Sequence, residues 1–145
     1  MAPSDGRASA GLHRTIPALP VRDVRTAAAN YRERFGFEAR HETDDFAVLM
    51  RDDAVLHLWS ASDEEWRSRA ELAARPICSG AESFLAGTGS CRIEVSDVDA
   101  LFEELEAQEV LHPTSREVGT TDFGTREFAT LDLDGNLLSF FRWEG

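Results

Sequence analysis

Two segments of the chain share one alternating pattern of apolar and polar side chains, and this pattern predicts two β-hairpins of the same design. The segments span residues 44–59 and 126–142. In the last strand of each hairpin one polar residue, His57 or Ser139, lies in a face that is otherwise apolar. An Asp-Gly pair at 134–135 predicts a tight turn in the second hairpin, because glycine tolerates positive φ. Two hairpins of one design indicate a duplicated unit.

A strand and an amphipathic helix precede each hairpin. The phrases VRDV (21–24) and VSDV (95–98) match in register, and Asp23 and Asp97 are expected to cap the helices that follow them. Gly36 is placed to end the first helix. Apolar residues recur at helical spacing in both: Val24, Ala27, Ala28, Tyr31 and Phe35, then Val98, Leu101, Phe102 and Leu105. The expected strands are 16–21, 37–41, 46–51 and 54–60 in the first half, and 91–95, 110–118, 127–133 and 136–142 in the second.

This order, β-α-β-β-β in each half, predicts an α+β fold in one domain at residues 15–143. Module one is expected at 15–60 and module two at 90–143, joined by a linker at 61–89 in which Ser62 and Glu65 predict a short helix. A half of roughly 50 residues cannot bury both faces of its sheet alone, so we expect the two halves to pair. Residues 1–14 have neither an apolar run nor a helical period, and are expected to form a disordered tail.

The composition and net charge of the chain limit the classes of molecule that it is expected to bind. Acidic residues number 27 against 15 basic ones, giving a formal net charge of -12. This charge argues against nucleic acid or an anionic membrane surface as a partner, and it suits a cationic ligand. No apolar run is long enough to span a membrane. The two cysteines, Cys78 and Cys91, form no CxxC motif and follow no signal peptide, which favours a reduced compartment such as the cytoplasm.

These paired modules resemble the vicinal oxygen chelate superfamily, which includes glyoxalase I, extradiol dioxygenases and bleomycin-resistance proteins. The matching phrases are DVRTAAANYRERFGFE (23–38), DDFAVLMRDDAVLHLW (44–59) and FGTREFATLDLDGNLLSFF (123–141). The resemblance covers residues 16–143 and is greatest to the bleomycin-binding resistance proteins. It implies a curved mixed sheet around a cleft.

The resemblance also identifies four strand positions where the superfamily's enzymes place metal ligands. In this chain they are Ile16, His57, Ser90 and Ser139, with Cys91 beside the third. A catalytic divalent ion needs several His or carboxylate ligands, and only His57 could serve here. We therefore expect no metal, no cofactor and no catalytic residue.

For the drug-binding relatives, the resemblance implies homodimers that sequester the drug without altering it, in grooves between the subunits. The ligand expected on this basis is a bleomycin-like glycopeptide antibiotic. Its cationic and planar end suits an acidic groove with aromatic walls, and any metal would arrive chelated by the drug. The alternative is a glyoxalase- or dioxygenase-like enzyme with an atypical or absent metal site, acting on an unknown small molecule.

Four candidate ligand-binding residues lie in module one. Phe46 matches a groove aromatic of the drug-binding relatives, so it either stacks on a flat ligand group or is a core residue. Asp45 either adds negative potential for a cation or lies in a solvated turn. His57 either hydrogen-bonds a ligand or bonds a neighbour within the core. Trp59 lies on the same strand face as His57 and offers a stacking surface.

Two more candidates lie in module two. Phe123 stands where the drug-binding relatives carry a Trp before Gly-Arg-Glu-Phe, and this chain has an additional residue, Thr125, in that phrase. Phe123 is therefore a candidate for stacking. Ser139 faces the expected cleft by alternation and is a candidate hydrogen-bond partner for a ligand. No Ser-His-acid set accompanies it, so no nucleophilic role is expected.

Overall fold

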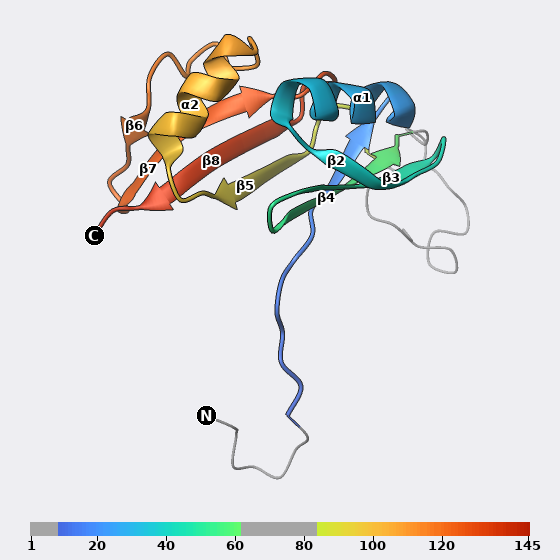
Figure 1. Cartoon of the computed structure of the whole chain (residues 1–145), viewed down its shortest axis with the longest axis horizontal. Helices are drawn as coiled ribbons and strands as arrows, with labels where there is room; N and C mark the ends of the chain where they lie inside the picture. The colour runs from blue at the N-terminus through green and yellow to red at the C-terminus, as the bar shows by residue number, and fades with distance from the viewer. Residues whose placement is uncertain (1–8, 62–83) are drawn as a thin grey trace.

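The computed structural model describes residues 9–61 and 84–145. It contains two four-stranded sheets with strand orders β1-β4-β3-β2 and β5-β8-β7-β6. Both helices lie on the same side of the sheets (Figure 1). The elements are β1 (Ala18–Val21), α1 (Val24–Phe35), β2 (Glu38–Glu42), β3 (Phe46–Arg51), β4 (Ala54–Ser60), β5 (Ser90–Glu94), α2 (Val98–Ala107), β6 (Gly119–Thr120), β7 (Thr125–Leu131) and β8 (Leu137–Trp143).

The two halves repeat one topology, which confirms the predicted α+β fold of paired β-α-β-β-β modules. We call β1–β4 with α1 module one, and β5–β8 with α2 module two. The first strand of each module pairs in parallel with the last one, and the other pairs are antiparallel. The modules also match in register, because Ala18 lies opposite His57 in the first and Arg92 opposite Ser139 in the second.

Both helices begin where the sequence predicts, and α1 also ends there. Asp23 accepts a hydrogen bond from the backbone N–H of Thr26 (2.9 Å), and Asp97 accepts one from the N–H of Ala100 (3.0 Å). Gly36 ends α1 in the left-handed conformation, at φ 74°. These caps fix where each helix starts relative to the strand before it.

Each helix covers one face of its own sheet and leaves the other face open. Leu56 and Leu58 of β4 are buried beneath α1, and Leu138 and Phe140 of β8 are buried on the side of α2. Because side chains alternate along a strand, their neighbours lie on the uncovered side. We call these uncovered sides the open faces of module one and module two.

The prediction of a strand at residues 110–118 is wrong. Leu111 makes a single antiparallel bridge to Thr130, and regular pairing begins only with the two residues of β6. Pro113 has no N–H to donate, and the N–H of Ser115 turns back to the carbonyl of His112 (2.8 Å). The chain therefore forms a turn where the sequence suggested a strand.

The turn of the second hairpin is also wider than the Asp-Gly pair predicts. Strand pairing ends at Leu131 opposite Leu137, so the residues between them, 132–136, form the loop. One carboxylate oxygen of Asp132, Oδ1, accepts hydrogen bonds from the backbone N–H groups of Asp134, Gly135 and Asn136 (2.8–2.9 Å). Gly135 does take positive φ, at 100°. The side chain of Asp132 thus stabilises a wider loop.

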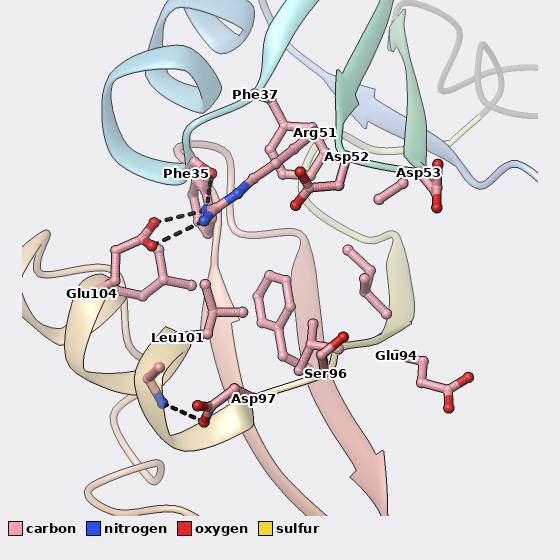
Figure 2. A pocket seen from close by; sticks show the side chains of 16 residues that line it. Phe35, Phe37, Arg51, Asp52, Asp53, Glu94, Ser96, Asp97, Leu101 and Glu104 are labelled. Carbon is pink, nitrogen blue, oxygen red and sulfur yellow. Dashed lines mark hydrogen bonds and ion pairs between the residues drawn. The ribbon is translucent and has the colours of Figure 1, made fainter.

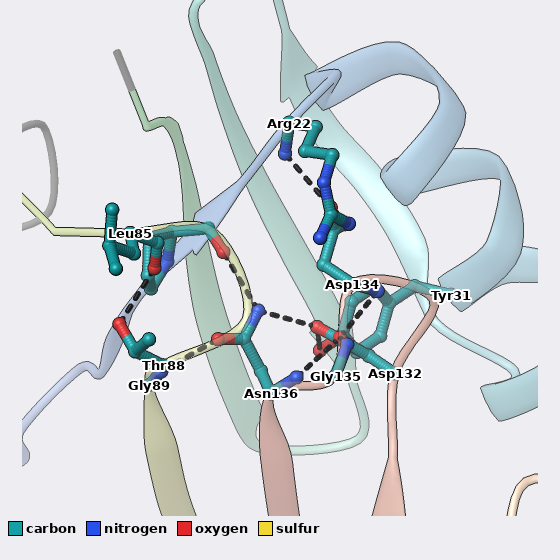
Figure 3. Close-up of polar contacts among 10 residues, drawn as sticks. Arg22, Tyr31, Leu85, Thr88, Gly89, Asp132, Asp134, Gly135 and Asn136 are labelled. Carbon is teal, nitrogen blue, oxygen red and sulfur yellow. Dashed lines mark hydrogen bonds and ion pairs between the residues drawn. The ribbon is translucent and has the colours of Figure 1, made fainter. Parts of the chain in front are cut away.

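Buried polar contacts join the two modules at this loop (Figure 3). The hydroxyl of Tyr31 donates to Asp132 Oδ2 (2.7 Å), which also accepts from Asn136 Nδ2 (2.9 Å). Asn136 Nδ2 also donates to the carbonyl of Pro20 (2.9 Å), and Asn136 Oδ1 accepts from the N–H of Gly89 (2.8 Å). Tyr31 and Asn136 have no solvent-accessible surface. We call Tyr31, Asp132 and Asn136 the inter-module network.

Parts of the predicted linker and tail lie outside the described residues. These are residues 1–8 and 62–83, which include Ser62, Glu65, Trp66 and Cys78. The described N-terminal residues, from position 9, approach the sheets from a distance as an extended segment without regular secondary structure, and residues 14–17 lie next to β4 and β5 just before β1 (Figure 1). No helix among the described residues is long and apolar enough to cross a membrane.

Candidate functional site

The open face of module one carries an aromatic cluster. Phe46 lies opposite Trp59 in the β3–β4 register, and their ring centroids are 4.3 Å apart. The rings of Phe46 and His57 are nearly perpendicular, with centroids 5.0 Å apart, and the ring centroid of His41 on β2 lies 5.8 Å from that of Phe46. Three of the predicted ligand-binding residues are therefore neighbours on one surface. Phe46 is partly exposed on this face, so it is not the core residue of the alternative interpretation.

His57 is partly buried, and burial lowers its pKa below the ordinary value of 6.5. The imidazole is therefore neutral at pH 7 and keeps one donor and one acceptor nitrogen. Asp45 is exposed at the start of this hairpin, where its backbone bonds Thr43 and Ser60. Among the described residues, the neighbouring Asp44 is paired with Arg25 (3.0 Å) and Asp45 has no ion pair, so within this part of the chain Asp45 offers the less compensated charge of the two.

The open face of module two has a different chemistry. Arg92 lies opposite Ser139, and its guanidinium makes two hydrogen bonds to Glu127 (2.6 and 3.3 Å). The Arg92 side chain also lies over the Phe141 ring, with Cζ 4.8 Å from the centroid. The guanidinium lowers the pKa of Glu127, with a smaller contribution from the Thr125 hydroxyl, so the carboxylate is ionised at neutral pH.

Ser139 and Phe123 are the predicted ligand-binding residues on this second face. Ser139 is partly exposed beside Arg92, and Phe123 is 58% exposed on the turn before β7. The six predicted ligand-binding residues do not include Arg92, Glu127 or Phe141, which also lie on this face. Strand alternation alone could have placed Arg92 and Glu127 facing the cleft, but no motif distinguishes them from the other charged residues.

Ile16, His57, Ser90 and Ser139 occupy the four positions where, by the resemblance, the superfamily's enzymes place metal ligands. Ile16 precedes β1, whose pairing begins at Ala18, and Ser90 is the first residue of β5, ahead of Arg92. The Cys91 side chain lies on the other face, where burial raises its pKa to about 11. One neutral imidazole with an isoleucine and two serines is not a donor set for a divalent ion. Over residues 9–61 and 84–145, no three His, Cys, Asp or Glu side chains cluster with metal-binding geometry.

A pocket of about 410 Å³ lies at the seam between the modules, on the side of the helices (Figure 2). Its rim is polar, but the main groups already have partners. Arg51 makes a two-pronged pair with Glu104 (2.7 and 2.9 Å) and bonds the carbonyl of Phe35, and Asp97 caps α2. None of the six predicted ligand-binding residues lines this pocket. The polar contacts at this pocket connect the two modules, so these side chains are not available to bind a ligand.

A second pocket, of about 800 Å³, lies where residues 14–17 pass close to β4 and β5. Ile16 and Arg92 line it, but the aromatic cluster does not. The six predicted residues instead divide between the two open faces: Asp45, Phe46, His57 and Trp59 on module one, and Phe123 and Ser139 on module two. Each open face is one side of a single sheet, and a groove requires a second surface opposite it.

Comparisons with known proteins agree with this architecture. The model of the glyoxalase/bleomycin resistance protein/dioxygenase superfamily matches residues 11–140. A bleomycin resistance protein of Geobacillus stearothermophilus is 46% identical over 128 residues, which cover 88% of this chain and 95% of that protein.

Two solved structures share the fold. The bleomycin-binding protein from bleomycin-producing Streptomyces verticillus, complexed with copper(II)-bleomycin, is 28% identical with a TM-score of 0.67, and the match covers 94% of this chain and 99% of that one. Lactoylglutathione lyase from Agrobacterium tumefaciens is 22% identical with a TM-score of 0.66, covering 92% and 96%. The fold thus serves both a drug-binding protein and an enzyme, so the distinction rests on the residues of the site.

Proposed function

Because the chain belongs to the glyoxalase/bleomycin resistance protein/dioxygenase superfamily, we propose that it is a bleomycin resistance protein that binds the drug stoichiometrically and does not alter it. The observation that carries this proposal is the 46% identity to a bleomycin resistance protein over nearly the whole of both chains. The copper(II)-bleomycin complex of the Streptomyces verticillus protein, at 28% identity, supports a drug of the same class.

The chemistry of the open faces fits such a ligand. The ring pair of Phe46 and Trp59 offers a flat apolar surface on which a planar heteroaromatic group stacks. Asp45 and the net charge of -12 attract the cationic part of the drug. His57 and Ser139 supply neutral hydrogen-bonding groups near the middle of each face. A metal carried by the drug remains coordinated by the drug.

The absence of catalysis is the part of the proposal that rests on the site alone. The residues at Ile16, Ser90 and Ser139 cannot replace the ligands that the superfamily's enzymes use, so no Lewis-acid step is assigned to this chain. No nucleophile with an adjacent base occurs on either open face as described. Sequestration needs neither, because resistance then follows from mass action on the free drug. A cytoplasmic location remains a prediction from the sequence.

A homodimer would complete the groove. In one chain both open faces lie on the side away from the helices and lack an opposing wall (Figure 1). Among the described strands, β5 pairs only with β8, which leaves one of its edges open to a second copy, whereas the outer edge of β1 is partly covered within the chain, because the Pro20 carbonyl accepts from the N–H of Gly87 (3.1 Å) and from Asn136 Nδ2 (2.9 Å). We expect sedimentation to give the mass of two chains. The mass of a single chain at micromolar concentration would contradict this arrangement.

Calorimetric titration with bleomycin tests the binding proposal. We expect a saturable heat with a dissociation constant in the micromolar range or below. Metal-free and copper-loaded drug should both bind, since no residue of this chain is assigned to the metal. Absence of any heat at micromolar protein and drug would exclude bleomycin as the ligand.

A further inference from the structure

The exposed ring of Phe123 is presented by a short turn between β6 and β7. The turn bends at Gly124, whose φ of 94° favours glycine. Phe123 is 58% exposed, so packing alone does not fix its direction. A ring that rotates freely loses more entropy on stacking than a ring already held in place. What holds this turn therefore bears on how well Phe123 can bind a flat ligand.

Two threonines close the turn on either side of Phe123. The N–H of Thr121 donates to the carbonyl of Thr125 (2.9 Å), and the N–H of Thr125 donates to Thr121 Oγ1 (3.1 Å). The two hydroxyl oxygens are 2.7 Å apart. Thr125 is only 1% exposed, so these bonds are shielded from water. Thr125, which the resemblance identifies as an additional residue, is thus a structural part of the turn.

A chain of hydrogen bonds leads from this turn to Arg92 on β5. The Thr125 hydroxyl donates to Glu127 Oε2 (2.8 Å), and the same oxygen accepts from Arg92 Nη2 (2.6 Å). Because the Thr125 hydroxyl has one proton and gives it to Glu127, the hydroxyl of Thr121 must be the donor in the pair. The direction of every bond is then fixed. We call Arg92, Glu127, Thr125 and Thr121 the turn network.

Arg92 also contacts the ring directly. Its Cζ lies 5.8 Å from the centroid of Phe123 and 4.8 Å from that of Phe141, within the range of cation–π attraction for both rings. The guanidinium is planar, and the two-pronged pair with Glu127 sets its orientation. Phe123 therefore has one fixed neighbour on β5 in addition to the closed turn.

The two modules differ at matching positions of the register. The register pairs Phe46 with Trp59 in module one and Glu127 with Phe141 at the matching place in module two. Module one thus has a strand residue, Phe46, as the second ring of its aromatic pair. Module two has a carboxylate there, and its exposed rings beside Phe141 are Trp143 at the end of β8, with centroids 5.8 Å apart, and Phe123 on the turn.

We propose that Arg92 is a positioning residue of the ligand site, which acts through Glu127, Thr125 and Thr121 to hold Phe123 against a flat group of the drug. This inference rests on the proposed function, because it takes the drug as the ligand of this face. It differs from a purely structural role in that the ion pair stabilises one orientation of an exposed ring. Arg92 itself needs no contact with the ligand.

A double-mutant cycle in bleomycin affinity tests the proposal, with Arg92→Gln, Phe123→Ala and the combined variant. Each single substitution is expected to weaken binding about tenfold. The combined variant should bind no more weakly than Phe123→Ala alone, because Arg92 acts through the ring. The proposal would be overturned if the combined variant lost affinity by the product of the two single losses. Wild-type affinity in Arg92→Gln would overturn it as well. Arg126→Gln is the matched control, because Arg126 makes an equivalent pair with Asp99 (2.6 and 3.1 Å).

A second readout needs no ligand. Chymotrypsin cleavage after Phe123, identified by fragment mass, should become several-fold faster in Arg92→Gln and stay unchanged in Arg126→Gln, since only the first frees the turn. Equal cleavage rates in the wild type and Arg92→Gln would contradict the positioning role. If the wild-type protein does not bind bleomycin, the proposed function fails, and the cleavage rates alone then decide whether Arg92 holds Phe123.

Discussion

Replacing Asp132 with alanine is expected to lower the free energy of unfolding by about 3–5 kcal/mol, the largest effect of any single substitution that we predict. The Asp132 carboxylate accepts three backbone N–H bonds through Oδ1, and bonds from Tyr31 and Asn136 through Oδ2. Its removal leaves the buried hydroxyl of Tyr31 without an acceptor. It also releases the loop through which module two contacts module one.

Urea denaturation of the wild type and the variant measures this change. Asp132→Asn keeps the shape and one acceptor oxygen, so it should lose less stability than Asp132→Ala and allow a measurement if the alanine variant does not fold. Asp53→Ala is the matched control: this exposed residue makes no side-chain hydrogen bond to the rest of the described chain, and we expect a change within about 0.5 kcal/mol. A loss below 1 kcal/mol in both Asp132 variants would show that the network does not stabilise the module pair.

Replacing Phe46 with alanine is expected to weaken bleomycin binding by about 30- to 100-fold, or roughly 2–3 kcal/mol. Phe46 is the central ring of the cluster, since it contacts both Trp59 (4.3 Å) and His57 (5.0 Å). The substitution removes a stacking surface and also leaves Trp59 without the neighbour that orients it. The loss should therefore exceed that from a single peripheral contact.

Stability and affinity must be separated in this experiment. Phe46 lies on the open face, so Phe46→Ala should leave the unfolding transition close to that of the wild type, and calorimetry then reports the binding loss alone. Leu133→Ala provides the matched control, because Leu133 is 54% exposed on the β7–β8 loop, outside both open faces. We expect its affinity to equal that of the wild type. An affinity of Phe46→Ala within threefold of the wild type would remove the aromatic cluster from the binding site.

The fold followed from the sequence because its signals are local and repeated. The capping aspartates, Asp23 and Asp97, and the alternating hairpins each specify structure over a few residues, and they agree with one another in both halves. The two errors arose where a side chain competes with backbone pairing. The Asp132 carboxylate widened the hairpin loop, and the turn at Pro113 replaced a strand whose apolar residues had suggested pairing.

The candidate site was predictable only in part. Phe46, His57 and Trp59 were found because they alternate on strands of one hairpin, so their proximity is a consequence of register. Arg92 and Glu127 come from strands that are distant in sequence, and their pairing depends on the tertiary arrangement of β5, β8 and β7. No local pattern reveals such a pair. The inter-module network escaped prediction for the same reason, since Tyr31 and Asp132 belong to different modules.

The central claim is that this chain uses an enzyme superfamily's scaffold to bind bleomycin without transforming it. Dialysis of the protein against bleomycin, followed by unfolding and mass analysis of the released drug, tests both parts of the claim at once. We predict that the drug is retained in stoichiometric amount and recovered with its mass unchanged, however long the incubation. Recovery of a drug of altered mass, or no retention above that of a protein-free control, would contradict it.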